Sequence, residues 1–292
     1  MVKYPRKIRF ISRFPFRIKS SSPAFDIIGY ILTLLYAAVI IVPLYYLFIS
    51  SLKDNATIFT QMLALPSKWD FANFIRAQDT VDLIGALLTS GRVAGLSEVA
   101  ALLLGFPVAY AIARIPTRLA GLTEAIFATG FLVPNFALLL PVFLLIASMG
   151  LLYNPFALVL TYTAHVLPRS IILLASVIRT IPRELEESAE MDGANRLQLI
   201  WHLFVPLSIA GVVTVAILNF ISFWGEYFFA LVLTNNATRT LPIAISALHT
   251  DRFIDYGILS AGAIFSMIPV YIVFILFSER IMTGMLAGAV KE

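Results

Sequence analysis

Six long apolar segments constrain the fold of this chain more than any other feature of its sequence. Each is long enough to cross the ~30 Å hydrocarbon layer of a bilayer as a helix that rises ~1.5 Å per residue. A spanning segment must satisfy its own backbone hydrogen bonds, so each is expected to be helical. The segments are Phe25–Ile49, Gly85–Ala113, Leu122–Ala147, Phe156–Ile178, Ser208–Leu233 and Tyr256–Phe277. The sequence therefore predicts an all-α integral membrane protein with six transmembrane helices.

The composition excludes an ordinary soluble domain. Of the 292 residues, 60% are hydrophobic and only 13% are charged, whereas a typical soluble domain has about 25% charged residues. The chain has no cysteine, so a disulfide, a thiol nucleophile and a cysteine-ligated metal are all excluded. Neither a catalytic residue nor a metal ligand is predicted.

The positions of lysine and arginine predict the orientation of the chain, because cytoplasmic connections carry an excess of basic residues. With both termini in the cytoplasm, fourteen basic residues fall inside, five fall outside and two, Arg92 and Arg169, fall within spans. The five outside are Lys53, Lys68, Arg76, Arg239 and Arg252.

This orientation divides the chain into three parts. Residues 1–24 are a basic cytoplasmic tail, residues 25–282 are the membrane domain, and residues 283–292 are a cytoplasmic C-terminal tail. A basic tail can also bind nucleic acid. A basic run that abuts a first span is instead typical of a topogenic signal, so no nucleic-acid partner is expected.

The connection between the fourth and fifth spans, Arg179–Leu207, is predicted to be a folded cytoplasmic element, which we call the hook. It carries five acidic and three basic residues, far more than a chain needs to return across a bilayer. A proline suits the first turn of a helix, where its missing N–H costs nothing, so a helix is expected from Pro182. Negative charge is favoured near the positive end of a helix, where Glu184, Glu186 and Glu187 fall.

A second short helix is expected to follow within the hook. Gly193 can adopt a left-handed conformation and end the first helix. Asn195 can cap a helix over Arg196–Phe204, and Pro206 is expected to stop it before the next span. A helix–turn–helix of this kind is typical of an element that another protein binds. The alternative is an amphipathic helix resting on the inner leaflet, where anionic lipids would repel the acidic side chains.

Part of the hook resembles a known motif. Its pattern is Glu187-Ser188-Ala189, three residues, Gly193, nine residues and Leu203-Phe204-Val205-Pro206. This is similar to the EAA loop of ATP-binding-cassette (ABC) importer permeases, whose form is Glu-Ala-Ala, three residues, Gly, nine residues and Ile-x-Leu-Pro. The departures, which keep the spacing, are Ser188, Leu203 and Val205. Further stretches are similar to the smaller permease subunit of maltose-type carbohydrate importers: Ser50–Lys53, Phe223–Glu226, Thr240–Pro242 and Thr283–Lys291.

The resemblance implies a type I ABC importer permease fold in a bacterial or archaeal cytoplasmic (inner) membrane. It implies a subunit of an ATP-driven, binding-protein-dependent sugar importer that forms half of the translocation pathway. The residues that would couple to the ATPase are Glu184, Glu187, Ser188, Ala189, Asp192, Gly193, Ala194, Leu203 and Pro206.

The same resemblance implies several partners. They are a second permease subunit in a heterodimer, two copies of an ABC ATPase, an extracytoplasmic solute-binding protein, the carbohydrate and membrane lipid. This sequence contains no glycine-rich phosphate loop with Lys-Ser/Thr. ATP and Mg are therefore expected on the partner ATPase subunits, and no cofactor is expected in this chain.

Charged residues inside the spans predict a translocation path, because intramembrane charges generally face a water-filled path or a partner. Measured from Arg114 and Arg179, the depths of Glu98 and Arg169 differ by only ~8 Å at ~1.5 Å per residue. We expect a Glu98–Arg169 pair, or both side chains lining the path with His165 one turn above Arg169. The alternative is an ion pair that only stiffens the bundle.

An aromatic–acid cluster in the fifth span is the second candidate for the path. Trp224 and Glu226, with Phe223 and Tyr227, suit the stacking of sugar rings and hydrogen bonding to hydroxyls near the outer mouth. An aromatic belt at the membrane interface is the alternative for the aromatic residues, but Glu226 needs polar surroundings. The candidate path residues are therefore Glu98, His165, Arg169, Trp224 and Glu226.

Two other functions are alternatives to a transport subunit without its own ATPase site. An ion-coupled secondary transporter would act without an ATPase and normally has more spans, with midplane acids serving ions. A membrane enzyme would need a cluster of His, Asp or Glu at catalytic spacing, and the three histidines are scattered. The sequence favours the transport subunit over both.

Overall fold

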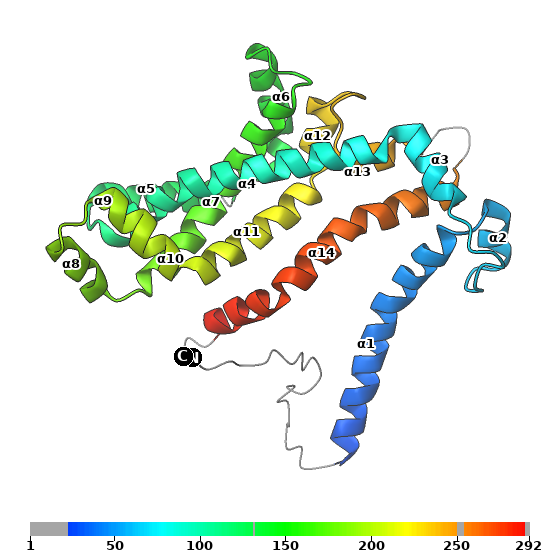
Figure 1. The fold of residues 1–292 in the computed structure, drawn as a ribbon, viewed down its shortest axis with the longest axis horizontal. Helices are drawn as coiled ribbons and strands as arrows, with labels where there is room; N and C mark the ends of the chain where they lie inside the picture. Colours follow the sequence, from blue (N-terminus) through cyan, green and yellow to red (C-terminus); the bar gives the residue numbers. More distant parts are fainter. Residues whose placement is uncertain (1–22, 131, 250–253, 290–292) are drawn as a thin grey trace, which may run out of the picture. The chain divides into compact units, whose positions relative to one another are not determined.

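The computed structural model describes the backbone of residues 23–130, 132–249 and 254–289, and this part of the chain is helical (Figure 1). The basic residues of the N-terminal tail, Arg252 and the last three residues of the chain lie outside the described residues. Met1–Tyr46 and Leu47–Glu292 form two compact units. The described part of the first unit is most of α1.

Four helices are long and apolar enough to cross a membrane. They are α1 (Pro23–Ser50), α4 (Leu83–Arg114), α7 (Pro155–Arg179) and α14 (Tyr256–Ala289). They confirm the first, second, fourth and sixth predicted spans, with most boundaries differing by a few residues. The sixth differs more, because α14 continues beyond the predicted end at Phe277 to Ala289. Within its own unit, α1 carries almost only apolar side chains, as a helix in contact with lipid requires.

The third and fifth predicted spans are each interrupted in the structure, although the all-helical membrane fold is confirmed. The third consists of α5 (Arg118–Gly130), the 3-10 turn η1 (Asn135–Leu138) and α6 (Leu139–Ser148), with a bend of 96°. Pro134 immediately precedes η1, and the residue before a proline is disfavoured in the helical conformation. Counting each bent pair as one span gives six in the described chain.

The fifth predicted span ends nine residues early as a continuous helix. Helix α11 (Ile209–Trp224) stops at Gly225, and a separate short helix, α12 (Phe228–Leu233), follows it. A bend of 80° separates α11 from the helical end of the hook. The reason for the second break is the side chain of Glu226, which caps the new helix as described below.

The remaining elements are short. They are α2 (Asn55–Thr60), α3 (Ala72–Val81), α8 (Arg183–Met191), α9 (Arg196–Gln198), the π-helical η2 (Leu199–Phe204), α10 (Val205–Leu207) and α13 (Leu241–Ser246). Elements α3 and α8 lie at opposite ends of α4 (Figure 1).

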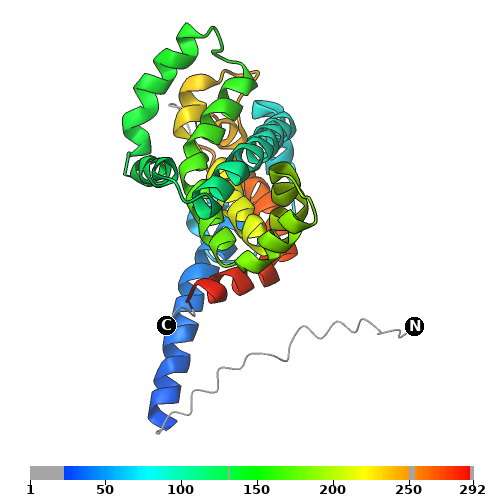
Figure 2. The same ribbon diagram turned by 90° about the vertical axis from the view of Figure 1, so that its left-hand side faces the viewer.

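The centre of the second unit is the packing of α4 along α7. Four small residues of α4 at four-residue spacing, Ser97, Ala101, Gly105 and Ala109, are buried. A Cβ atom built on Gly105 would lie 3.5 Å from Ile171 of α7. Small residues at this spacing let two helix backbones approach closely inside a membrane. Helix α11 packs against both, and the three lie together when the molecule is seen from the α8 end (Figure 2).

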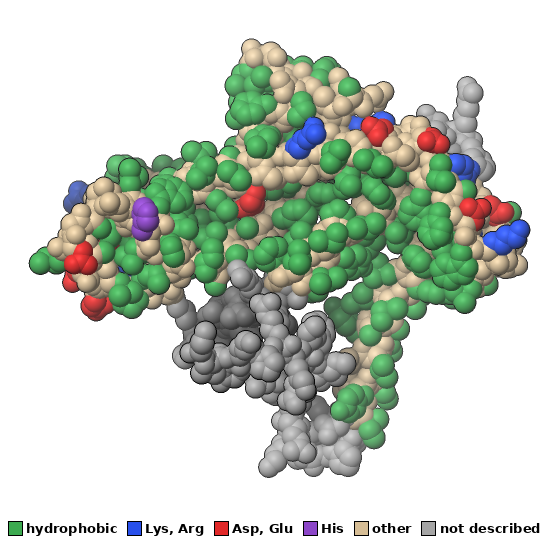
Figure 3. All heavy atoms as spheres, in the orientation of Figure 1, with side chains coloured by type: hydrophobic (Ala, Val, Ile, Leu, Met, Phe, Trp, Pro, Cys, Tyr) green, Lys and Arg blue, Asp and Glu red, His purple; other side chains and the backbone are tan. Residues whose placement is uncertain are grey.

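Charged side chains gather over the α8 end and over the α2–α3 end, whereas the face between them is largely hydrophobic (Figure 3). A membrane protein shows this distribution because the hydrocarbon layer faces its middle and water faces its ends.

Candidate coupling site and polar cluster

The first helix of the hook is stabilised at both ends by its own sequence. Pro182 is the N-cap of α8, one residue before the predicted position, and Glu184 and Glu186 lie in the first turn. Gly193 has φ +86°, which confirms the predicted left-handed turn. The Gly193 N–H donates to the Glu190 carbonyl and the Ala194 N–H to the Ala189 carbonyl, both at 3.0 Å. These two bonds form a Schellman motif.

The second helix of the hook begins as predicted but ends later. Asn195 and Gln198 form a capping box at its start. The chain then continues as a π-helix, η2, and passes through Pro206 to Leu207. The prediction that Pro206 stops the helix is wrong. A proline removes one i→i−4 hydrogen bond and crowds the preceding turn, and a π-turn directly before it alters the hydrogen-bond pattern of that turn.

Glu186 anchors the hook to the membrane domain. Its side chain is only 12% exposed. Oε1 accepts a 2.6 Å hydrogen bond from the Tyr110 hydroxyl of α4 and lies 3.5 Å from Arg196 Nη1. Oε2 lies 3.6 Å from Nε of Arg114, at the end of α4. Arg196 also donates to the Tyr110 hydroxyl at 3.0 Å and pairs with Glu190 at 2.9 Å. We call Tyr110, Arg114, Glu186 and Arg196 the anchor network.

Arg114 extends the anchor network to α7. Its side chain is only 4% exposed, and Nη2 donates to the carbonyls of Ile178 (2.8 Å) and Ile181 (2.5 Å). Its guanidinium also lies 5.0 Å from the ring centroid of Phe204 in η2, a cation–π contact. One arginine thus joins the end of α4, the end of α7 and the second helix of the hook.

The tip of the hook is exposed. Of the predicted coupling residues, Glu184, Glu187, Ser188, Asp192, Gly193 and Pro206 are exposed, whereas Ala189, Ala194 and Leu203 are partly buried against the core. Three apolar side chains that were not predicted, Leu185, Met191 and Leu197, are also exposed, and Met191 is 88% exposed. Acidic and apolar side chains therefore share the free surface of the hook.

Between the spans, Asn219 joins Glu98 to Arg169. Asn219 Nδ2 donates to Glu98 Oε1 at 3.4 Å, and Arg169 Nη2 donates to Asn219 Oδ1 at 3.0 Å. Glu98 and Arg169 form no direct ion pair in the described chain, so the predicted direct pair is replaced by a bridge from α4 through α11 to α7. Glu98 Oε2 and Arg169 Nε are buried without a hydrogen-bond partner in the described part of the chain.

His165 lies one turn from Arg169 on α7, as predicted. Its Nε2 lies 3.2 Å from the amide nitrogen of Asn135, which follows the break in the third span. These three side chains line a cavity of about 160 Å³. Non-helical backbone at membrane depth is tolerated where it lines a cavity or is buried in protein.

The predicted aromatic–acid cluster in the fifth span is divided between two places. Glu226 caps α12, because its carboxylate accepts from the N–H groups of Phe229 (2.8 Å) and Ala230 (3.0 Å), and it also accepts from the Tyr162 hydroxyl at 2.8 Å. Trp224 is buried elsewhere, with Nε1 donating to the Ser266 carbonyl of α14 at 3.0 Å.

Trp224 lines a groove of about 540 Å³ between the end of α11 and helices α13 and α14. The groove also contains Tyr271, Met267 and Pro242. Tyr271 is 46% exposed and Trp224 is 8% exposed. The groove therefore contains two aromatic rings, and only that of Tyr271 is accessible.

Comparison with known proteins identifies the family. Residues 101–286 match the family described as the binding-protein-dependent transport system inner membrane component. The chain is 32% identical over 85% of its length, and 88% of the relative, to the sulfoquinovosyl glycerol transport system permease protein of Agrobacterium fabrum. It is 35% identical over 86% of its length, and 92% of the relative, to the trehalose transport system permease protein of Mycobacterium tuberculosis.

A solved structure shows the same fold. It is a crystal structure of a bacterial ABC transporter involved in the import of the acidic polysaccharide alginate, with a TM-score of 0.79 and 25% identity. The match covers 88% of this chain and 96% of the other. The ion-coupled alternative is therefore replaced: the chain belongs to the family of inner membrane permease components of binding-protein-dependent ABC transport systems.

Proposed function

We propose that this chain imports a carbohydrate as one half of the translocation pathway and that its hook couples the pathway to an ABC ATPase. The observation that carries the coupling proposal is the anchor network. Tyr110, Arg114, Glu186 and Arg196 hold the base of the hook to α4 and α7, whereas the tip is exposed.

A coupling element needs both properties. The exposed surface must bind a partner that moves, and the base must be stiff enough to pass the movement to the spans. Leu185, Met191 and Leu197 offer the apolar contacts typical of the centre of an interface. Glu184 and Glu187 supply charges suited to a basic rim on the partner.

The partners in this proposal are a second permease subunit, two copies of the ATPase and an extracytoplasmic solute-binding protein. ATP and Mg bind the ATPase subunits, because the sequence has no phosphate-binding loop. A bacterial alginate ABC transporter has been solved in complex with a periplasmic protein bound to an alginate pentasaccharide.

The substrate class is proposed from the groove beside Trp224. Its volume of about 540 Å³ lies within the range of roughly 300–1,000 Å³ common for small-molecule sites. The aromatic face of Tyr271 suits the apolar face of a sugar ring, and the names of the relatives mention sulfoquinovosyl glycerol, diacetylchitobiose and trehalose.

The polar cluster around Asn219 is proposed to line the path. Intramembrane charged residues mark solute pathways in membrane proteins, and Glu98 and Arg169 each keep a buried polar atom without a partner in the described residues. His165 and Asn135 line a cavity with Arg169. A solute hydroxyl could replace the missing hydrogen bonds.

Cysteine crosslinking tests the coupling proposal directly, because the native chain has no cysteine. In the assembled transporter, S188C at the exposed tip should crosslink to the ATPase and the yield should change when ATP is added. The matched control is T60C, which is also exposed but lies at the opposite end of the second unit. Equal crosslinking from both positions, or none from S188C in a complex that still hydrolyses ATP, would contradict the proposal.

Uptake into proteoliposomes tests the transport proposal. The complete complex with its binding protein should accumulate a labelled carbohydrate only with internal ATP. Uptake by the purified chain alone, without an ATPase, would contradict it.

A further inference from the structure

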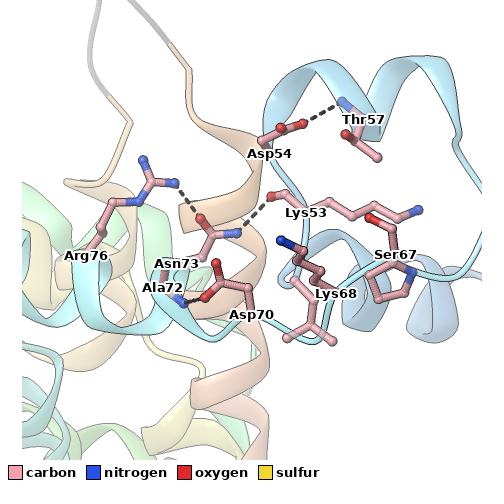
Figure 4. Close-up of a pocket in the computed structure, with 11 residues that line it drawn as sticks. Lys53, Asp54, Thr57, Ser67, Lys68, Asp70, Ala72, Asn73 and Arg76 are labelled. Carbon is pink, nitrogen blue, oxygen red and sulfur yellow. Dashed lines mark hydrogen bonds between the residues drawn. The ribbon is translucent and has the colours of Figure 1, made fainter.

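A polar pocket of about 260 Å³ lies among the turn after α1, helix α2 and helix α3 (Figure 4). It is at the opposite end of α4 from the hook. Its lining includes Lys53, Thr57, Ser67, Lys68, Asn73 and Arg76. None of these residues belongs to the anchor network or to the cluster around Asn219.

Lys53 is a buried cation in this pocket. The residue is only 4% exposed, and its Nζ donates to the Gln61 carbonyl at 2.8 Å. Burial lowers the pKa of Lys53 below its ordinary value. An ammonium has three donors, and buried charges are normally paired. Lys53 forms no ion pair with any carboxylate in the described chain.

Two acids, Asp54 and Asp70, also line the pocket, and both already accept backbone hydrogen bonds. Asp54 accepts from the Thr57 N–H at 2.7 Å, and Asp70 accepts from the Ala72 N–H at 2.9 Å. Both carboxylates therefore serve the turns that begin α2 and α3.

The third cation of the pocket is already paired, since Arg76 pairs with Asp255 at 3.0 Å. Lys53 and the exposed Lys68 are left as the cations without an ion pair among the described pocket residues. Figure 4 shows the Lys53 side chain extended between α2 and the segment that carries Ser67 and Lys68.

The pocket lies at the level where two spans end. Lys53 follows the end of α1 by three residues. Asn55 bonds to the residues that begin α14, donating to the Ile254 carbonyl and accepting from the Tyr256 N–H, both at 2.8 Å. The hydrocarbon layer ends where these apolar helices end, so the pocket is at the depth of lipid headgroups.

The surface around the pocket is apolar and aromatic, although it lies outside the spans. Phe59, Met62, Leu65, Trp69 and Phe71 are all more than half exposed. Aromatic residues at this depth are typical of membrane–water interfaces. A pocket with two lysines that form no ion pair in the described chain, surrounded by exposed apolar side chains, matches a ligand with an anionic head and an apolar tail.

We propose that this pocket binds the phosphate group of a membrane phospholipid, with Lys53 and Lys68 donating to the phosphate oxygens. The exposed side chains of Phe59, Met62 and Trp69 contact the upper part of the acyl chains. The bound lipid supplies the ion-pair partner that Lys53 lacks in the described chain, and it fixes the loop between α1 and α3 on the membrane surface.

Thermal unfolding in the presence of added lipid tests the proposal. The full-length chain, purified in dodecyl maltoside with the subunits that accompany it and stripped of lipid, is titrated with dihexanoyl phosphatidylglycerol. The melting temperature should rise with a saturable dependence on lipid. Loss of one basic contact to lipid should weaken binding roughly fivefold, so the half-saturating concentration should rise by that factor in K68Q.

Three variants make the test specific. K68Q changes an exposed side chain and is expected to fold normally. K53R keeps the charge and should bind, whereas K53Q should show the larger loss. R118Q, an exposed change at the other end of α4, should titrate as the native chain does.

The contrary outcomes are distinct. An equal rise in melting temperature with inorganic phosphate would overturn the lipid assignment in favour of a free anion. If the half-saturating lipid concentration is unchanged in both K68Q and K53Q, the lipid binds somewhere other than this pocket. No saturable rise in the native chain would overturn the site altogether, and retention of an acidic partner protein in place of lipid would show that the pocket belongs to a protein interface.

Discussion

Replacing Glu186 by glutamine should release the hook from the membrane domain. Breaking a buried ion pair by neutralising one partner costs about 3–5 kcal/mol. The loss here is smaller, because Arg114 keeps its bonds to two backbone carbonyls and glutamine can still accept from Tyr110. The contact to Arg196 adds little, since that side chain is 65% exposed. We expect α8 to lose about 2 kcal/mol of local stability.

Hydrogen exchange of α8 measures this loss. An amide that exchanges through local opening becomes less protected in proportion to the opening constant, so about 2 kcal/mol corresponds to a roughly 30-fold faster exchange. Amides of α7 near its centre should not change. The matched control is E184Q, in the same turn, since Glu184 is exposed and forms no ion pair in the described chain. If E186Q exchanges at the native rate in α8 while the protein remains folded, the anchor network does not hold the hook.

Three further changes have expected outcomes. Gly193→Ala should lower stability by about 1 kcal/mol, because φ is +86°, whereas Gly193→Asn should cost less; melting curves in detergent compare them. Asn219→Leu removes the hydrogen bond to Glu98, whereas Arg169 keeps its bonds to the Leu218 carbonyl and the Ser222 hydroxyl; it should cost about 2 kcal/mol, while Asn219→Gln should cost less in the same assay. Hydrogen bonds from the Thr57 side chain and N–H hold the pKa of Asp54 below its ordinary value of 3.8; the stabilisation of α2 is therefore complete above that value and is lost as pH falls through the lower, folded pKa. Asp54→Asn should remove this dependence in melting curves measured against pH, and a persistent dependence would contradict the assignment.

The parts of the hook that sequence could predict are set by neighbouring residues. A glycine after an acidic helix and an asparagine before an amphipathic turn act through backbone groups a few residues away. Gly193 and Asn195 therefore occupy the predicted roles in the structure. The resemblance to the EAA loop added the family but not the geometry of the hook.

The anchor network could not be predicted because its members are distant in sequence. Three glutamates fall in the first half of α8, and only the position of Tyr110 and Arg114, more than 70 residues earlier, decides that Glu186 is the buried one. In the sequence, Arg114 indicates only the orientation of the chain. A usable signal existed for Asn219, since an amide in an otherwise apolar span generally has a polar partner.

The breaks in two spans had local signals that hydropathy obscures. Pro134 follows the end of α5, and Gly225 with Glu226 interrupts the fifth span with a flexible residue and an acid. Mean hydropathy is averaged over a window of residues, so one or two such residues lower it only slightly. An acid that caps a helix inside a span, as Glu226 does, instead starts a new element.

The row of small residues on α4 has a consequence for how the molecule can move. Ser97, Ala101, Gly105 and Ala109 are buried, and side chains of α7 such as Ile171 pack directly onto this row; such close packing resists sliding of one helix along the other. Helices α4 and α7 should therefore move together as one rigid body. Opening the solute path alternately to the two sides of the membrane would then require movement at the two bends between helices, one beside Pro134 and one at Ser208.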